Sequence, residues 1–153
     1  MHKFIIIALV FFSSVTTAKT FTEESLTALA NKFVNAKNAR QQPNTTKDDI
    51  EHYLSLLAED FVDEHIKYNV IQTDKDKLRQ SMMAKMSDKV ISSSIKIDEL
   101  MIGANGVFIK MNEKGKVKPA HLDKVIEYNA TNIVSLEFND DGLIKHIRRH
   151  HGF

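Results

Sequence analysis

The side chain best suited to acid–base chemistry is His65, which ends the stretch Asp63-Glu64-His65. Imidazole titrates near neutral pH, so His65 can accept or donate a proton under ordinary conditions. Side chains alternate between faces along an extended strand, and this places Asp63, rather than Glu64, beside His65. His65 is therefore a candidate general base, although a polar residue at a strand end with no chemical role also fits the sequence.

Two polar residues interrupt the apolar face of a long alternating segment. Tyr128 and Asn132 share this face with Ala130 and Val134, because side chains two apart in a strand point the same way. A buried amide must find hydrogen-bond partners, either in the protein or in a ligand. A tyrosine here could direct its hydroxyl into a pocket or pack as core with an exposed tip. Both residues are candidate ligand contacts.

The basic C-terminal segment divides its side chains between two faces. Leu143, Ile147, Arg149 and His151 share the face that carries more large apolar residues, so we predict that this face is interior. Arginine binds carboxylate or phosphate through a two-pronged fork. The sequence therefore predicts an anion-selective pocket, with Arg149 and Ile147 as candidate ligand contacts.

The same segment does not predict a metal site or a nucleic-acid interface. Arg148 lies between His146 and His150 on one face and His151 lies on the other, which separates and repels the ligands that a metal would need. The chain has 21 Lys and Arg against 20 Asp and Glu, so it lacks the basic excess of a nucleic-acid binder. We expect no metal and no cofactor.

The N-terminus has the three-part order of a secretory signal peptide. Met1–Lys3 is basic, Phe4–Phe12 is apolar, and the following small polar residues end at Ala18. The apolar run is shorter than the roughly 20 residues that cross a bilayer. We expect cleavage after Ala18, which leaves residues 19–153 as one periplasmic or secreted domain without a membrane anchor. Cysteine is absent, so packing must stabilise it.

Apolar periodicity predicts helices followed by strands. Helices are expected from about Phe21 to Asn38, with a capping box from Thr20 to Glu23, and from about Thr46 and Thr73. A short strand is expected at residues 61–65. Four long antiparallel strands should follow Lys89, with a bulge near residues 98–99, a turn at residues 113–116 and a hairpin turn at residues 140–142.

This element order resembles the nuclear transport factor 2-like superfamily, whose enzymes include SnoaL-like polyketide cyclases and ketosteroid isomerases. Leu57–His65 looks like the family's helix end and first strand, and Val134–Ile144 looks like its phenylalanine–turn–glycine–x–isoleucine hairpin. The resemblance implies an α+β cone, with three N-terminal helices packed on a strongly curved antiparallel sheet. It also implies a homodimer, as in many relatives.

The resemblance implies chemistry inside the cone, but the family's catalytic residues are missing. The isomerase's tyrosine falls on Phe33, its strand acid on Val134 and its base on His65. Two donors to a developing oxyanion are therefore absent, which argues against ketosteroid isomerisation. The cyclase's acid falls on Arg149, which does not exchange protons near neutral pH. Phe33 remains a candidate pocket wall.

Three functions fit these residues. The first is the binding of a small, acidic organic molecule by Arg149, Asn132, Tyr128 and His65. The second is a lyase, isomerase or hydrolase reaction with His65 as general base. The third is a non-catalytic interaction module whose cone is filled with side chains. The missing catalytic pattern favours the first.

Overall fold

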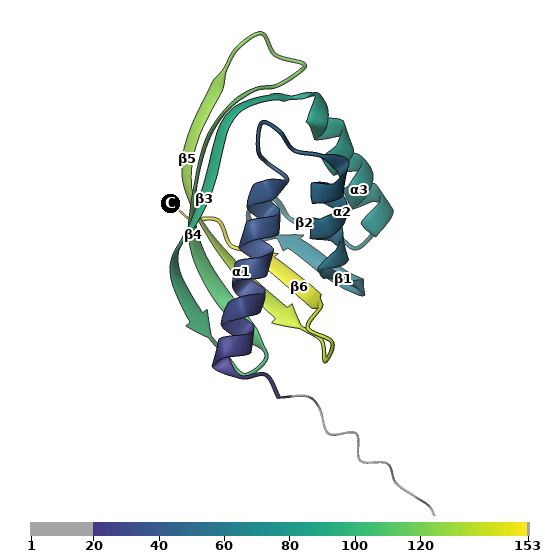
Figure 1. The fold of residues 1–153 in the computed structure, drawn as a ribbon, viewed down its shortest axis with the longest axis vertical. Helices are drawn as coiled ribbons and strands as arrows, with labels where there is room; N and C mark the ends of the chain where they lie inside the picture. Colours follow the sequence, from purple (N-terminus) through teal and green to yellow (C-terminus); the bar gives the residue numbers. More distant parts are fainter. Residues whose placement is uncertain (1–19, 153) are drawn as a thin grey trace, which may run out of the picture.

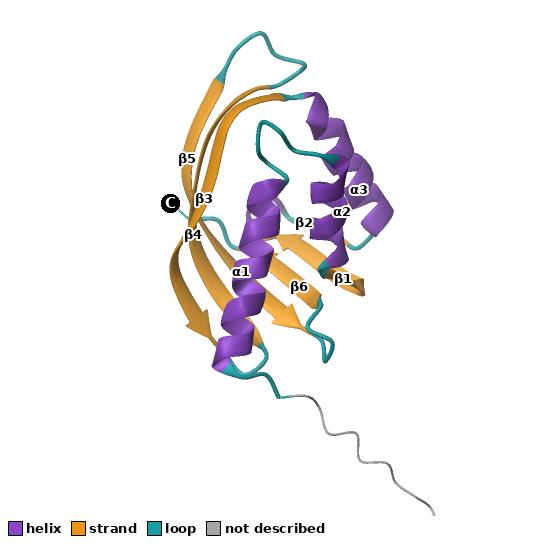
Figure 2. Ribbon diagram, in the orientation of Figure 1, coloured by secondary structure: helices purple, strands orange, loops and turns teal. Residues whose placement is uncertain are grey.

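Three helices lie on one face of a curved, open sheet of six strands within residues 20–152, the part of the chain that the computed structural model describes (Figure 1, Figure 2). The helices are α1 (Glu23–Ala39), α2 (Lys47–Ser55) and α3 (Lys75–Ala84), with 3-10 turns η1 (Ile66–Tyr68) and η2 (Lys85–Ser87). The strands are β1 (Leu57–His65), β2 (Val70–Gln72), β3 (Lys89–Ile102), β4 (Gly106–Lys118), β5 (Ile126–Phe138) and β6 (Ile144–Arg149). The predicted α+β cone is confirmed, and the predicted leader at residues 1–18 lies outside the described residues.

The strands are ordered β2-β1-β6-β5-β4-β3 across the sheet. Neighbours run antiparallel except β1 and β6, which are parallel with His65 opposite Arg149. This pair makes the sheet mixed, whereas the sequence predicted antiparallel strands. It joins segments far apart in the chain, so no hairpin dictates its direction. The β5–β6 connection turns at Gly142, whose φ is 77°, in the predicted hairpin turn.

The helices begin at polar caps. Thr46 and Asp49 form a complete capping box at α2, which matches the predicted start. The predicted capping box at Thr20 is wrong, because Thr22 caps α1, whereas α3 begins after its cap Asp74, close to the predicted start near Thr73. In each case the capping oxygen accepts a backbone N–H in the first turn. Within residues 20–152, no helix is long and apolar enough to cross a membrane.

The long strands differ from the prediction at one place. The register of β3 shifts between Ile97 and Glu99, which confirms the predicted bulge. The predicted turn at residues 113–116 was wrong, because this segment continues β4 with Gly115 paired to Tyr128. A Cβ atom at Gly115 would lie 2.5 Å from the Tyr128 hydroxyl oxygen. Glycine is therefore required by the tyrosine that packs across it, and does not mark a turn.

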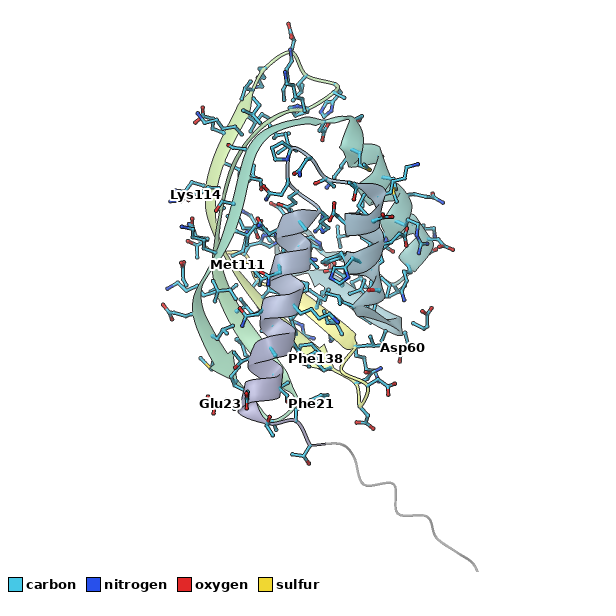
Figure 3. All side chains as sticks on the ribbon, viewed as in Figure 1. Phe21, Glu23, Asp60, Met111, Lys114 and Phe138 are labelled. Carbon is cyan, nitrogen blue, oxygen red and sulfur yellow. The ribbon has the colours of Figure 1, made fainter. Side chains whose placement is uncertain are left out.

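Apolar side chains fill the narrow part of the cone. Phe33 on α1, Tyr53 on α2 and Phe61 on β1 have relative exposures of 0–1%. Ile109 and Ile147 close the sheet side of this core, and both are 0% exposed. Figure 3 shows the alternation along β4, because Met111 points towards α1 while Lys114 points away from the helices. These side chains pack the interior between the helices and the sheet, and the end of the cone beside the loop between α1 and α2, called its wide end below, holds a pocket.

Candidate ligand site

Charged and polar side chains gather in the cone above this apolar core. We call them the interior cluster; they come from α1 and its C-cap, α2, β1, β4, β5 and β6. Its members are Lys37, Arg40, Tyr53, Asp63, Glu113, Asn132 and Arg149. Charges in such a position need partners, because burial removes water that would otherwise solvate them. The pairing within the cluster therefore decides which groups are left for a ligand.

Arg149 is fully engaged by the protein. Its Nε and Nη2 atoms each donate to a different Asp63 oxygen, both at 2.7 Å, and Nη2 also reaches the Tyr53 hydroxyl at 3.2 Å. The Asp63 side chain is 4% exposed and that of Arg149 11%. Burial alone would lower the pKa of Arg149, but Tyr53 and Asp63 outweigh it and raise the pKa above its usual value. The fork predicted for an acidic ligand is thus occupied by Asp63.

Lys37 and Glu113 form a second buried pair. Lys37 Nζ lies 2.6 Å from Glu113 Oε1, and the Asn132 amide donates to the same oxygen at 2.9 Å. Burial lowers the pKa of Lys37 from 10.5 to about 8, against the opposing effect of Glu113. The structure thus gives the predicted buried amide, Asn132, a protein partner.

Unlike Lys37 and Arg149, Arg40 forms no ion pair with a carboxylate within residues 20–152. Its guanidinium stacks 4.5 Å from the centre of the Tyr53 ring, a cation–π contact. Its Nε atom is buried without a hydrogen-bond partner in the described residues. Burial lowers the pKa of Arg40, against the attraction of Tyr53 and the more distant charges of Asp63 and Glu113. Guanidinium nevertheless remains charged in proteins, so Arg40 carries an interior charge that no direct ion pair neutralises.

Arg40 and Glu113 both line a pocket of about 430 Å³ at the wide end of the cone. In Figure 1 the ends of β3, β4 and β5 arch over the loop between α1 and α2 at this end. Apolar walls come from the end of α3, η2 and the neighbouring strands, and polar rims from the loop. The remaining lining residues are Gln41, Gln42, Pro43, Thr45, Met82, Lys85, Met86, Asp88, Val90, Val117 and Tyr128.

The structure brings some of the predicted site residues together. Arg149 and Asn132 belong to the interior cluster, as the alternation of β5 and β6 predicted. Tyr128 lines the pocket. Phe33 and Ile147 are fully buried in the core and do not line this pocket, so their proposed ligand contacts stay predictions.

His65 lies at the edge of the interior cluster. Its Nε2 atom is 3.8 Å from Asp63 Oδ1, and its ring centre is 5.8 Å from that of His151. Burial, followed by the charge of Arg149, lowers its pKa, so its neutral form is favoured at neutral pH. His65 does not line the pocket at Arg40. Within the described part of the chain, no group of three or more His, Cys, Asp or Glu could hold a metal ion.

Sequence reasoning missed Lys37, Arg40 and Glu113. Phe33, Lys37 and Arg40 are four and three residues apart, so they share one helical face. Two cations that continue a buried stripe are a signal for an interior site. Glu113 continues the alternation of Ile109 and Met111, but the turn predicted there concealed it.

No family model matches the chain, and no curated protein matches it by sequence. Several solved structures resemble it in fold. A protein from Shewanella denitrificans named as a SnoaL-like polyketide cyclase has a TM-score of 0.66 and 12% identity, over 82% of this chain and 89% of that one. An epoxide hydrolase of the LEH-like type from M. tuberculosis has a TM-score of 0.59 and 13% identity, over 82% and 80%.

A computationally designed binder of 17-OHP has a TM-score of 0.60 and 13% identity, over 84% of this chain and 91% of that one. Together these neighbours show that the chain has the nuclear transport factor 2-like cone fold. At this level of identity the likeness defines the fold, and the chemistry of the site has to be argued from the residues of this chain.

The stability of an Asp63 variant measures the free-energy cost of burying the Arg149 charge without its counter-ion. We expect Asp63→Asn to destabilise the fold by about 3–5 kcal/mol, because Arg149 would remain buried without a counter-ion. Asp60→Asn is the matched control, since the Asp60 side chain is 72% exposed and lies 3.7 Å from Lys145. Urea denaturation measures both. Equal stability of the two variants would show that the Asp63–Arg149 pair does not need its charge.

Lys37 should titrate near pH 8 in the folded protein, which NMR of its side-chain methylene groups can follow. The folded pKa lies below the unfolded value of 10.5, so the protonated amine costs stability below about pH 8, and the cost disappears as pH rises towards 10.5. Glu113→Gln should lower the midpoint further, because it removes the attraction of the carboxylate. A midpoint that rises or stays unchanged in this variant would contradict the pairing.

Proposed function

We propose that this protein binds a small organic acid in the pocket at the wide end of the cone, with Arg40 as the anchor of the acid group. The observation that carries the proposal is Arg40, which forms no ion pair with a carboxylate among the described residues and lines a pocket of about 430 Å³. A carboxylate would supply the charge and the acceptor that Arg40 lacks.

The charge balance of the interior cluster supports an anion. Lys37 is offset by Glu113, and Arg149 is offset by Asp63. These pairs leave Arg40 as a net positive charge in a region of low effective dielectric, where Coulomb interactions are stronger than in water. Within this proposal Arg149 acts on the ligand indirectly, because it holds Tyr53, on whose ring Arg40 stacks.

The fold of the neighbours is consistent with this use. One neighbour is by name a designed binder of 17-OHP, and another is by name an epoxide hydrolase. These names describe a binder and a hydrolase, which is consistent with a ligand site in this fold. The reaction class of the neighbours is not carried over, because the identities are 12–13% in the structures named above.

One observation favours an enzyme as the second candidate. The lowered pKa of His65, caused first by burial, keeps its imidazole neutral at neutral pH, the form that a general base requires. Against this role, both oxygens of the nearby Asp63 are taken by Arg149. A turnover rate that rises with pH below the usual imidazole pKa of 6.5 and is abolished by His65→Gln would favour the enzyme over the binder.

Arg40→Gln tests the binding proposal directly. We expect small carboxylic acids to shift the NMR signals of pocket residues and their methyl esters to bind more weakly, because the ester removes the charge. The variant should bind the acids at least tenfold more weakly, as expected for the loss of a charge-assisted hydrogen bond. Arg148→Gln is the control, since Arg148 pairs with Glu64. Equal affinity of both variants for the acids would overturn the proposal.

We also propose that the protein is exported and forms a homodimer. The leader pattern of residues 1–18 supports export, and exposed Met101, Phe108 and Ile133 on the outer sheet face support self-association. Native mass spectrometry of protein recovered from its own host tests both points. A chain that begins at Lys19 and a doubled mass are expected. A chain that retains Met1, or a monomer at micromolar concentration, would contradict the respective point.

A further inference from the structure

Glu113 offers a second polar contact in the pocket that holds Arg40. Its Oε1 atom accepts from both Lys37 and Asn132. Its Oε2 atom accepts no hydrogen bond from any residue in the described part of the chain, and it is not among the buried unpaired atoms. Glu113 lines the pocket, so this free acceptor is open to a ligand there. An ionised carboxylate oxygen binds a hydroxyl or amine donor strongly.

The walls beyond these two residues combine polar side chains with a continuous set of apolar ones. Met82, Met86, Val90 and Val117 line the pocket, and Tyr128 adds an aromatic side chain. Met82 is buried, whereas Met86 is 39% exposed and stands towards solvent. Methionine adapts its shape to irregular apolar groups, so this wall tolerates chains of differing form. The pocket is therefore amphipathic, with an apolar wall beside charged side chains, which include Lys85 and Asp88 as well as Arg40 and Glu113.

We infer that the ligand is an amphipathic hydroxy or amino acid: a carboxylate for Arg40, a hydroxyl or amine donor for Glu113 Oε2, and an apolar body against the methionine wall. This inference rests on the proposed function, since it names the class of acid that the same site selects. We expect one carboxylate on the ligand, because the methionine and valine wall offers no cation to a second one. Lys85, which also lines the pocket, would contact a second acid only if the far end of the ligand reached it.

Four probes of equal chain length separate these features. Octanoate carries the acid and the apolar body, and 2-hydroxyoctanoate adds the donor. 1-Octanol lacks the acid, and octanedioate carries a second acid at the far end. Calorimetric titration of the folded protein with each probe gives the affinities. Titration of Glu113→Gln, with Glu127→Gln as the control, tests whether Glu113 is the source of the affinity that the hydroxyl group adds. Glu127 is suited as a control because its partner is Lys116.

We expect 2-hydroxyoctanoate to bind about tenfold more tightly than octanoate, as for one added hydrogen bond to a charged group. This advantage should vanish in Glu113→Gln and persist in Glu127→Gln. 1-Octanol and octanedioate should each bind at least tenfold more weakly than octanoate. Binding of octanoate by Glu113→Gln shows that the variant is folded.

The outcomes distinguish the two proposals. If octanoate binds and depends on Arg40, but the hydroxyl brings no gain or the gain survives Glu113→Gln, the hydroxy or amino acid class is wrong and the binding function stands. If octanedioate equals octanoate, the apolar end is wrong. If 1-octanol binds as tightly as octanoate, or if no acid binds, the proposed function itself fails.

Discussion

The paired charges of Asp63 and Arg149 are the constraint on which the interior of this protein depends. The pair joins β1 to β6, the two strands that run parallel, and the Tyr53 hydroxyl extends it to α2. Three elements from distant parts of the chain therefore converge on one guanidinium. A buried arginine without such partners would cost several kcal/mol, so this geometry is required for the cone to close around it.

The same pair determines which cation faces the pocket. Because Asp63 satisfies Arg149 and Glu113 satisfies Lys37, Arg40 is left with only the face of the Tyr53 ring. A ring face attracts a cation without neutralising it. The cluster thus pairs two of its three cations and leaves the third without a direct ion pair, which is the arrangement on which the proposal of an acidic ligand rests.

Local patterns predicted the fold because they depend on neighbouring residues in the chain. Alternation placed Arg149 and Asn132 on the interior face, and the phase slip located the bulge near Asp98. The partner of Arg149 could not be predicted in this way. Asp63 reaches it only because β1 pairs with β6 across a register that no hairpin sets, and that pairing is a property of the whole fold. The sequence shows that Asp63 and Arg149 carry opposite charges, but it does not show that the fold brings them into contact.

The failure at Gly115 shows how one misread residue concealed the site. Glycine beside lysines was interpreted as a turn, which ended the strand before Glu113 and removed a carboxylate from the predicted interior. In the structure Gly115 lies opposite Tyr128, so the glycine and the tyrosine are consequences of one close contact. Because β4 continues past Glu113, its upper half forms a wall of the pocket. Phe33 and Ile147 are packed in the core, and the pocket at the wide end of the cone lies where Arg40 and Glu113 stand.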